Sequence, residues 1–224
     1  MNEPRNVKSV DYFSLSRPEM MKYVPDEAKT ILDIGCGEGI FGQELKKRAN
    51  REVWGIEIVG ECAEKAGKRL DRVMVGDIET GDFDLPGDFF DCIICNDVLE
   101  HCRDPWSVLR RLKINLKENG CVVASIPNVR YYENVRKLLL HREWKYESCG
   151  ILDYGHLRFF TQKSILSMFA ECGYDVTMIE GSNPMRWSWK LKLATMILGD
   201  FLKDMQYLQF ACIARVKGEY RDRL

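Results

Sequence analysis

Short apolar runs rich in β-branched residues alternate along this chain with stretches whose apolar residues recur at helical spacing. This alternation is typical of a parallel sheet covered by helices on both faces. The predicted strands span residues 30–34, 53–58, 72–75, 90–95, 121–126, 174–179 and 208–216. Predicted helices span residues 39–49, 62–70, 129–139 and 161–173. We therefore predict an α/β fold.

A further helix has a clear start signal. Asp104 can accept hydrogen bonds from the first turn, and Pro105 needs no N–H at the first helical position. Apolar residues then recur every four positions as far as Leu116, and Asn119-Gly120 predicts the end of the helix.

Two segments interrupt this pattern. Residues 128–160 read as a lid-like insertion, and residues 184–205 as a helical excursion that begins with two tryptophans among basic residues. The excursion can lie in a membrane interface, or pack on its own domain or on a second subunit of a homodimer. At 224 residues, the chain fits one domain spanning residues 1–224.

Composition narrows the choice of partners. Lys and Arg number 33 against 34 Asp and Glu, a net charge of −1, so we expect no nucleic-acid partner. No apolar run reaches membrane-spanning or signal-peptide length, and nine cysteines, an odd number, suit buried thiols, so we expect a cytoplasmic protein. Cys92 and Cys95 would point to opposite faces of one strand, so we expect no metal site.

Three glycines mark a ligand-binding turn. Gly35, Gly37 and Gly39 lie where a predicted strand passes into a helix, and glycines there let backbone N–H groups approach a ligand. Glu57, at the end of the next strand, can accept both hydroxyls of a ribose. Together these residues predict a nucleoside cofactor site.

The identity of the nucleoside is less direct, since residues 37–42 also fit the GxGxxG pattern of dinucleotide sites. Asp33 stands directly before the glycines, where a carboxylate suits an ammonium group and opposes a pyrophosphate. This favours a ligand that carries an amino acid. An NAD(P)-dependent oxidoreductase stays open as the alternative.

The order of the motifs resembles that of class I S-adenosylmethionine-dependent methyltransferases, from about residue 12 to residue 216. The motifs are ILDIGCGEG at 31–39, VWGIEI at 53–58, GDIE at 76–79, FDCIICNDVLEHCRDP at 90–105 and GCVVASIPN at 120–128. The resemblance implies a Rossmann-like sheet of seven strands, mostly parallel, with an antiparallel last strand. The implied S-adenosylmethionine contacts are Asp33, Gly35, Gly37 and Gly39 at the methionine end, Glu57 at the ribose, Ile58 and Ile78 on the adenine faces, Asp77 at the adenine amino group, and the backbone of Asn96 beside the methionine.

Methyl transfer requires a nucleophile held in line with the S–CH3 bond, and an oxygen or nitrogen nucleophile can also need a general base. His101 follows the fourth predicted strand, and His156 lies in the insertion, so both are candidate bases; the alternatives are a backbone hydrogen bond for His101 and packing on Phe159 and Phe160 for His156. Tyr12 and Arg17 precede the first strand, where Arg17 either meets the methionine carboxylate or faces solvent.

Residues 128–148 mix basic and aromatic side chains, which suits a small-molecule acceptor that is anionic or sugar-bearing, although a solvated helix with an apolar inner stripe explains the same residues and is the slightly favoured interpretation. The amino-acid sequence of this segment and of residues 150–165 resembles the ubiquinone-biosynthesis and polysaccharide-pathway branch of the family. This resemblance favours an oxygen acceptor. A catalytically silent, cofactor-binding partner protein is the non-enzyme alternative.

Overall fold

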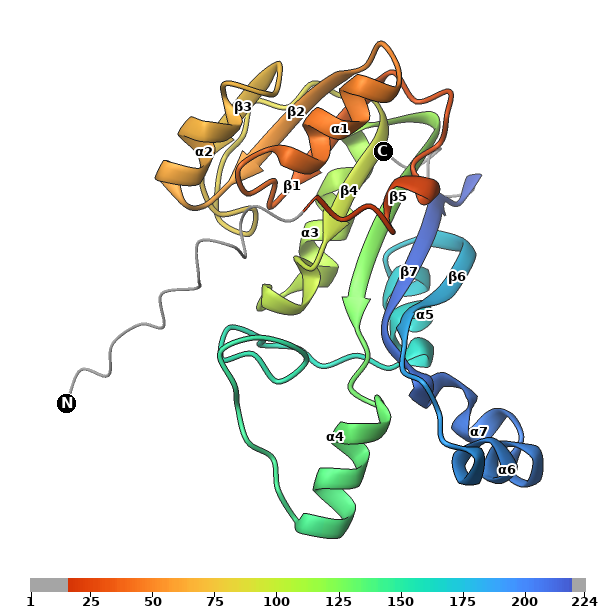
Figure 1. The fold of residues 1–224 in the computed structure, drawn as a ribbon. Helices are drawn as coiled ribbons and strands as arrows, with labels where there is room; N and C mark the ends of the chain where they lie inside the picture. The colour runs from red at the N-terminus through yellow and green to blue at the C-terminus, as the bar shows by residue number, and fades with distance from the viewer. Residues whose placement is uncertain (1–15, 219–224) are drawn as a thin grey trace, which may run out of the picture.

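The computed structural model describes residues 16–218, and Tyr12 lies outside them. Its centre is a seven-stranded sheet in the order β3-β2-β1-β4-β5-β7-β6 (Figure 1). The strands are β1 (Thr30–Ile34), β2 (Glu52–Glu57), β3 (Arg72–Val75), β4 (Phe90–Asn96), β5 (Leu116–Pro127), β6 (Tyr174–Pro184) and β7 (Tyr207–Val216). Strands β1 to β5 pair in parallel, and β7 runs antiparallel to both neighbours. This confirms the predicted fold class.

Helices cover both faces of the sheet, as the alternation predicted. The longer ones are α1 (Ile40–Arg48), α2 (Gly60–Ala66), α3 (Pro105–Leu112) and α5 (Gln162–Glu171), with short turns η2 (Met21–Tyr23), η3 (Leu99–His101) and η4 (Lys113–Asn115). Along β4, Cys92 and Ile94 join the core beneath α1 and α2, whereas Ile93 and Cys95 join the core beneath α3 and α5. Cys92 and Cys95 therefore point to opposite faces, as predicted.

The prediction that one helix continues from Pro105 to Asn119-Gly120 is wrong. Helix α3 begins at Pro105 behind the Asp104 cap but ends at Leu112, and after the turn η4 the chain enters β5 at Leu116. Leu116 pairs with Phe90 of β4, so its apolar side chain serves the sheet. Gly120 lies inside β5, where a Cβ atom would stand 2.9 Å from the carbonyl oxygen of Phe90. The glycine allows this close strand contact and does not end a helix.

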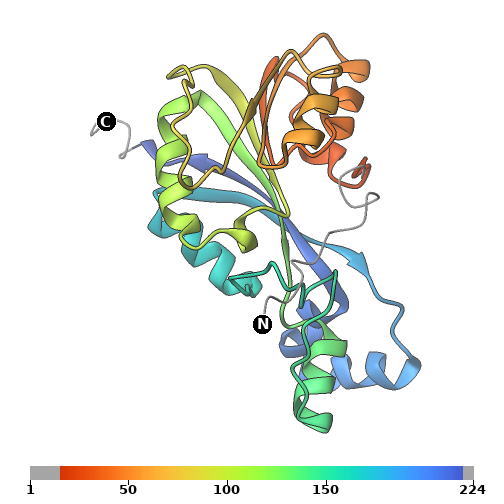
Figure 2. The ribbon, with the colours of Figure 1, turned by 90° about the vertical axis from the view of Figure 1, so that its left-hand side faces the viewer.

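Both interrupting segments lie beyond the carboxyl ends of the parallel strands (Figures 1 and 2). The insertion contains α4 (Tyr132–Arg136) and its continuation η5 (Lys137–His141), and the excursion contains α6 (Trp189–Leu198), α7 (Asp200–Lys203) and η6 (Asp204–Gln206). The Arg130 side chain bonds the Asp204 carboxylate at 2.7 Å, and Asn128 donates to the carbonyl oxygens of Asp204 and Tyr207. The base of the insertion is therefore fastened to the start of β7.

Among the described helices, none has the length and apolar character needed to cross a bilayer. Helix α6 nonetheless presents Trp189 and Met196, 71% and 82% exposed, to the surroundings. These exposures leave the membrane-interface and second-subunit interpretations of the excursion as predictions.

Candidate functional site

The glycine turn joins β1 to α1 in left-handed backbone. Gly35, Gly37 and Gly39 have φ angles of 67°, 55° and 77°, a region that side chains with a Cβ adopt at a cost. A Cβ atom at Gly35 would also stand 2.9 Å from the Cγ2 atom of Val98. The turn therefore needs glycine at position 35 for two reasons, and it lies directly against the segment that follows β4.

Two carboxylates stand beside this turn at the ends of neighbouring strands. Glu57 is buried, and its two oxygens accept hydrogen bonds from the N–H groups of Gly37 at 2.8 Å and Val59 at 2.9 Å. Asp33 is also buried, and within residues 16–218 no hydrogen bond to its carboxylate is seen. Burial, together with the charge of Glu57, raises the pKa of Asp33 to about 8.

This electrostatic arrangement tests which cofactor fits. Bringing two buried carboxylates together is unfavourable unless a positive group compensates them. An ammonium or sulfonium cation relieves the repulsion between Asp33 and Glu57, and a pyrophosphate increases it. The residues present therefore fit S-adenosylmethionine, and they oppose the dinucleotide.

The predicted adenine contacts lie at the ends of β2 and β3. Ile58 is 64% exposed, so its side chain is available to pack on an aromatic ring. Ile78, in contrast, is largely buried in the core beneath α3. The Asp77 carboxylate accepts a hydrogen bond from the N–H of Glu79 at 2.8 Å, which is the turn-capping alternative for this residue. The roles of these three residues toward adenine stay predictions.

The end of β4, which pairs with β1, brings further polar groups to this edge of the sheet. Among the described residues, the buried Oδ1 atom of Asn96 has no hydrogen-bond partner, so this side chain has capacity to bind a ligand. Arg17 forms an ion pair with Asp97, and its guanidinium also lies 3.4 Å from the Oε1 atom of Gln209. Arg17 therefore lies at the loop after β4 and is not turned to solvent, and its contact with the methionine carboxylate stays a prediction.

The two candidate bases meet. His101 ends η3 and His156 lies in the insertion, yet their ring centroids are 4.6 Å apart in an edge-to-face contact. The Nδ1 atom of His101 is 2.9 Å from the carbonyl oxygen of Gly155, and that of His156 is 2.8 Å from the carbonyl oxygen of Ile151. His156 packs on His101, whereas the ring of Phe159 packs on Trp144. The structure thus joins two residues that the sequence suggested separately.

Sequence reasoning missed a third member of this group, Glu100. This side chain is 1% exposed, and its Oε1 atom lies 3.9 Å from the Nε2 atom of His156. The backbone carbonyl of Glu100 accepts hydrogen bonds from the N–H groups of Leu157 and Arg158, so the insertion is fastened here. The available signal was a carboxylate that directly follows the apolar pair Val98-Leu99 and precedes a candidate base.

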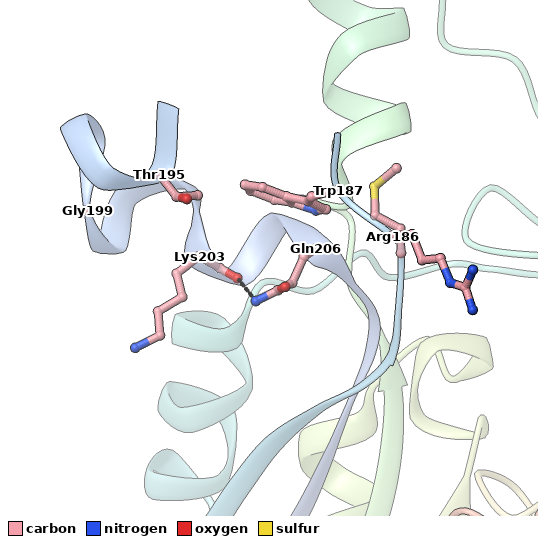
Figure 3. Close-up of a pocket in the computed structure, with 7 residues that line it drawn as sticks. Arg186, Trp187, Thr195, Gly199, Lys203 and Gln206 are labelled. Carbon is pink, nitrogen blue, oxygen red and sulfur yellow. Dashed lines mark hydrogen bonds between the residues drawn. The ribbon is translucent and has the colours of Figure 1, made fainter. Parts of the chain in front are cut away.

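A small cavity of about 90 Å³ opens beside this cluster. Its polar lining comes from the loop after β4, the insertion and the start of β7: Asp97, Glu100, Asp153, His156 and Gln209. A larger hollow of about 660 Å³ belongs to the excursion and is lined by Arg186, Trp187, Lys203 and neighbours. In Figure 3 the Arg186 and Lys203 side chains point away from one another, and no residue of the glycine turn lines this hollow. The smaller cavity, unlike this hollow, is lined by the loop after β4, whose Val98 lies against the glycine turn at Gly35.

The α/β fold places Asp33, the glycine turn and Glu57 where the strand order reverses between β1 and β4, the usual position of ligands in such sheets. Residues 10–179 match the family described as "Methyltransferase domain". The chain belongs to this family and is a class I S-adenosylmethionine-dependent methyltransferase.

Named relatives share part of this sequence. A ubiquinone biosynthesis O-methyltransferase of Cereibacter sphaeroides is 27% identical over 179 residues, covering 75% of this chain and 70% of the relative. An enzyme of the same name from Histophilus somni is 26% identical over 185 residues, covering 73% of this chain and 77% of the relative.

Solved structures share the fold. A SAM-dependent methyltransferase from Archaeoglobus fulgidus superposes with a TM-score of 0.67 at 18% identity, covering 90% of this chain and 93% of the other. A SAM-dependent methyltransferase from Thermotoga maritima, described as a possible histamine N-methyltransferase, gives a TM-score of 0.62 at 19% identity, covering 93% and 91%. At these identities the likeness concerns the fold alone.

Proposed function

We propose that this protein transfers the methyl group of S-adenosylmethionine to a hydroxyl oxygen of a small-molecule acceptor, bound in the cavity beside Glu100 and His156. One observation carries this proposal. Val98 touches the glycine turn at Gly35, and two residues further along the chain begins a cluster of proton-accepting side chains that faces the cavity. The cofactor end and the proton acceptors are therefore close together.

Each part of the crevice has a distinct task. The bound cofactor supplies an electrophilic methyl group. Asp33 holds the ammonium group, and Glu57, already oriented by the N–H groups of Gly37 and Val59, accepts the ribose hydroxyls. The insertion covers the cavity and excludes water. His156 lines the cavity and turns Nδ1 to a backbone carbonyl oxygen, so in the neutral ring its Nε2 carries the lone pair that accepts a proton from the acceptor hydroxyl. His101, whose Nδ1 faces the carbonyl oxygen of Gly155, packs behind it as the second candidate base.

The choice of oxygen rests on the names of the relatives, which are O-methyltransferases, and on proton-accepting groups at the cavity. The charges of the insertion support neither an oxygen acceptor nor an anionic one. Three of the basic residues of the insertion have acidic partners close by: Arg130 with Asp204, Arg136 with Glu133 and Lys137 with Glu147. An anionic or sugar-bearing acceptor and a homodimer therefore rest on the sequence pattern alone.

Two measurements test the proposal. S-adenosylhomocysteine, and not NAD, should raise the melting temperature of the purified protein, since a ligand stabilises only the state that binds it. Incubation with methyl-labelled S-adenosylmethionine and fractionated metabolite pools should then give a labelled ether that resists alkali. Label released by alkali would indicate a methyl ester of a carboxyl group. That result would overturn the assignment of a hydroxyl oxygen as the acceptor. Cofactor binding without any labelled product would favour a silent partner protein.

A further inference from the structure

We propose that Glu100, His101 and His156 bind one divalent transition-metal ion, Mn²⁺ or Zn²⁺, at the inner wall of the acceptor cavity. The role of this ion rests on the proposed function, but its binding does not. One potential ligand atom from each of the three residues lies within 4.8 Å of the other two. This site departs from the sequence-based expectation of no metal, which considered cysteine spacing only.

The distances suit a shared ion after a small movement of the side chains. Ligand atoms around a tetrahedral ion with bonds of about 2.1 Å are roughly 3.4 Å apart. The Nε2 atom of His156 and the Oε1 atom of Glu100 are 3.9 Å apart, too long for a hydrogen bond between them but close to that spacing. A rotation about the Glu100 side-chain bonds is enough to bring the pair onto one ion.

Both imidazoles are already oriented as metal ligands. A carbonyl oxygen only accepts hydrogen bonds, so the Nδ1 atoms that face Gly155 and Ile151 must carry hydrogen. In the neutral rings, the lone pairs of His101 and His156 are therefore on Nε2. Metal-binding histidines are held in this tautomer by the same type of backbone contact on the other ring nitrogen.

The composition of the cluster selects the ion. Two imidazoles and one carboxylate suit Mn²⁺, Fe²⁺ or Zn²⁺, whereas Mg²⁺ prefers oxygen ligands alone. Three protein ligands leave positions open, and Glu100 and His156 line the cavity of about 90 Å³ into which those positions would face. With the ion bound, the Nε2 lone pairs are occupied as ligands, so the ion replaces the histidines as the group that activates the acceptor. It would stabilise the oxyanion of an acceptor hydroxyl bound to it, and the hydroxyl proton would pass to water.

Manganese is the sharper probe, because this chain holds nine cysteines, of which Cys149 is exposed, and thiolates bind Zn²⁺ readily. The full-length protein would be treated with a chelator, and Mn²⁺ binding followed by loss of the free-ion electron paramagnetic resonance signal. We expect one Mn²⁺ per chain. Glu100→Gln and His156→Ala should each weaken Mn²⁺ at least about tenfold. His141→Ala removes the third histidine of the chain, on the exposed end of η5, and should change nothing.

Parallel calorimetry with S-adenosylhomocysteine separates the two hypotheses and shows that each variant is folded. Retained binding of S-adenosylhomocysteine together with no Mn²⁺ uptake by the unaltered protein would overturn the metal site and leave the methyltransferase proposal standing. Mn²⁺ binding that Glu100→Gln and His156→Ala do not weaken would equally overturn it, because the ion would then be bound elsewhere on the chain.

Discussion

The imidazole of His156 packs edge to face on that of His101 with the ring centroids 4.6 Å apart, so the insertion and the segment after β4 share one wall of the acceptor cavity. The contact is reinforced by backbone hydrogen bonds from Leu157 and Arg158 to the carbonyl of Glu100. The groups proposed to activate the acceptor therefore depend on the insertion being docked.

This shared wall predicts non-additive effects on catalysis. His101→Ala and His156→Ala should each reduce the rate of methyl transfer by about 100-fold, a typical loss for a general base and also for a metal ligand. The double variant should be little slower than either single one, because residues that act as one unit are lost together. Initial rates of label incorporation check this, and S-adenosylhomocysteine affinity should be unchanged. Multiplicative losses would show that the two histidines act independently.

Substitution of Asp33 should have opposite effects on cofactor binding and on the stability of the ligand-free protein. Because its pKa in the native protein, about 8, lies above its ordinary value of 3.8, the native state holds this proton more tightly. The free energy of unfolding therefore falls as the pH rises between these two values. Asp33→Asn removes this penalty, and at pH 9 should stabilise the ligand-free protein by about 2 kcal/mol, or roughly 4–8 °C in melting temperature.

The same substitution should nearly abolish binding of S-adenosylhomocysteine, because the amide cannot compensate its ammonium group. Thermal unfolding at pH 5 and pH 9, with calorimetry at pH 8, tests both halves. A variant that is destabilised at pH 9 would contradict the assignment of a buried carboxylate without a compensating charge.

Cofactor affinity should itself depend on pH. Only the ionised form of Asp33 attracts the ligand ammonium group, so the affinity for S-adenosylhomocysteine should rise by up to about tenfold per pH unit from pH 6 and level off near pH 8. Calorimetric titrations at half-unit intervals measure this slope. In Asp33→Asn the residual affinity should lose it, which separates Asp33 from the other titrating groups.

Most of the fold could be predicted from the sequence, because the signals for its strands and helices are local. The apolar run of β1 is followed at once by the glycine turn, and Asp104-Pro105 begins α3 by chemistry confined to one turn, so both were predicted to the residue. The end of α3 was not, because Leu116 fits a four-residue helical repeat and a strand equally well, and its pairing with Phe90 is not a local property. Glu100 joins the two histidines only because the insertion folds back over η3, a contact that no spacing in the sequence encodes.

The glycine turn predicts a graded series of alanine substitutions. At Gly35 alanine meets both a φ of 67° and the Cγ2 atom of Val98 at 2.9 Å, so Gly35→Ala should destabilise the protein by about 2–3 kcal/mol and weaken S-adenosylhomocysteine binding. Gly150 has a φ of 86° with open space around it, so Gly150→Ala isolates the backbone cost, about 1 kcal/mol.

Gly60 serves as the control for both the backbone cost and the steric contact, because it begins α2 without a left-handed φ and its Cβ position is open. Gly60→Ala should be neutral or stabilising by up to about 1 kcal/mol, since alanine favours the helix. Urea unfolding of the three variants, with calorimetry for S-adenosylhomocysteine, gives the comparison. Equal losses for Gly35→Ala and Gly150→Ala would mean that Val98 gives way, and that the contact between the glycine turn and the loop after β4 does not hold the cofactor end in place.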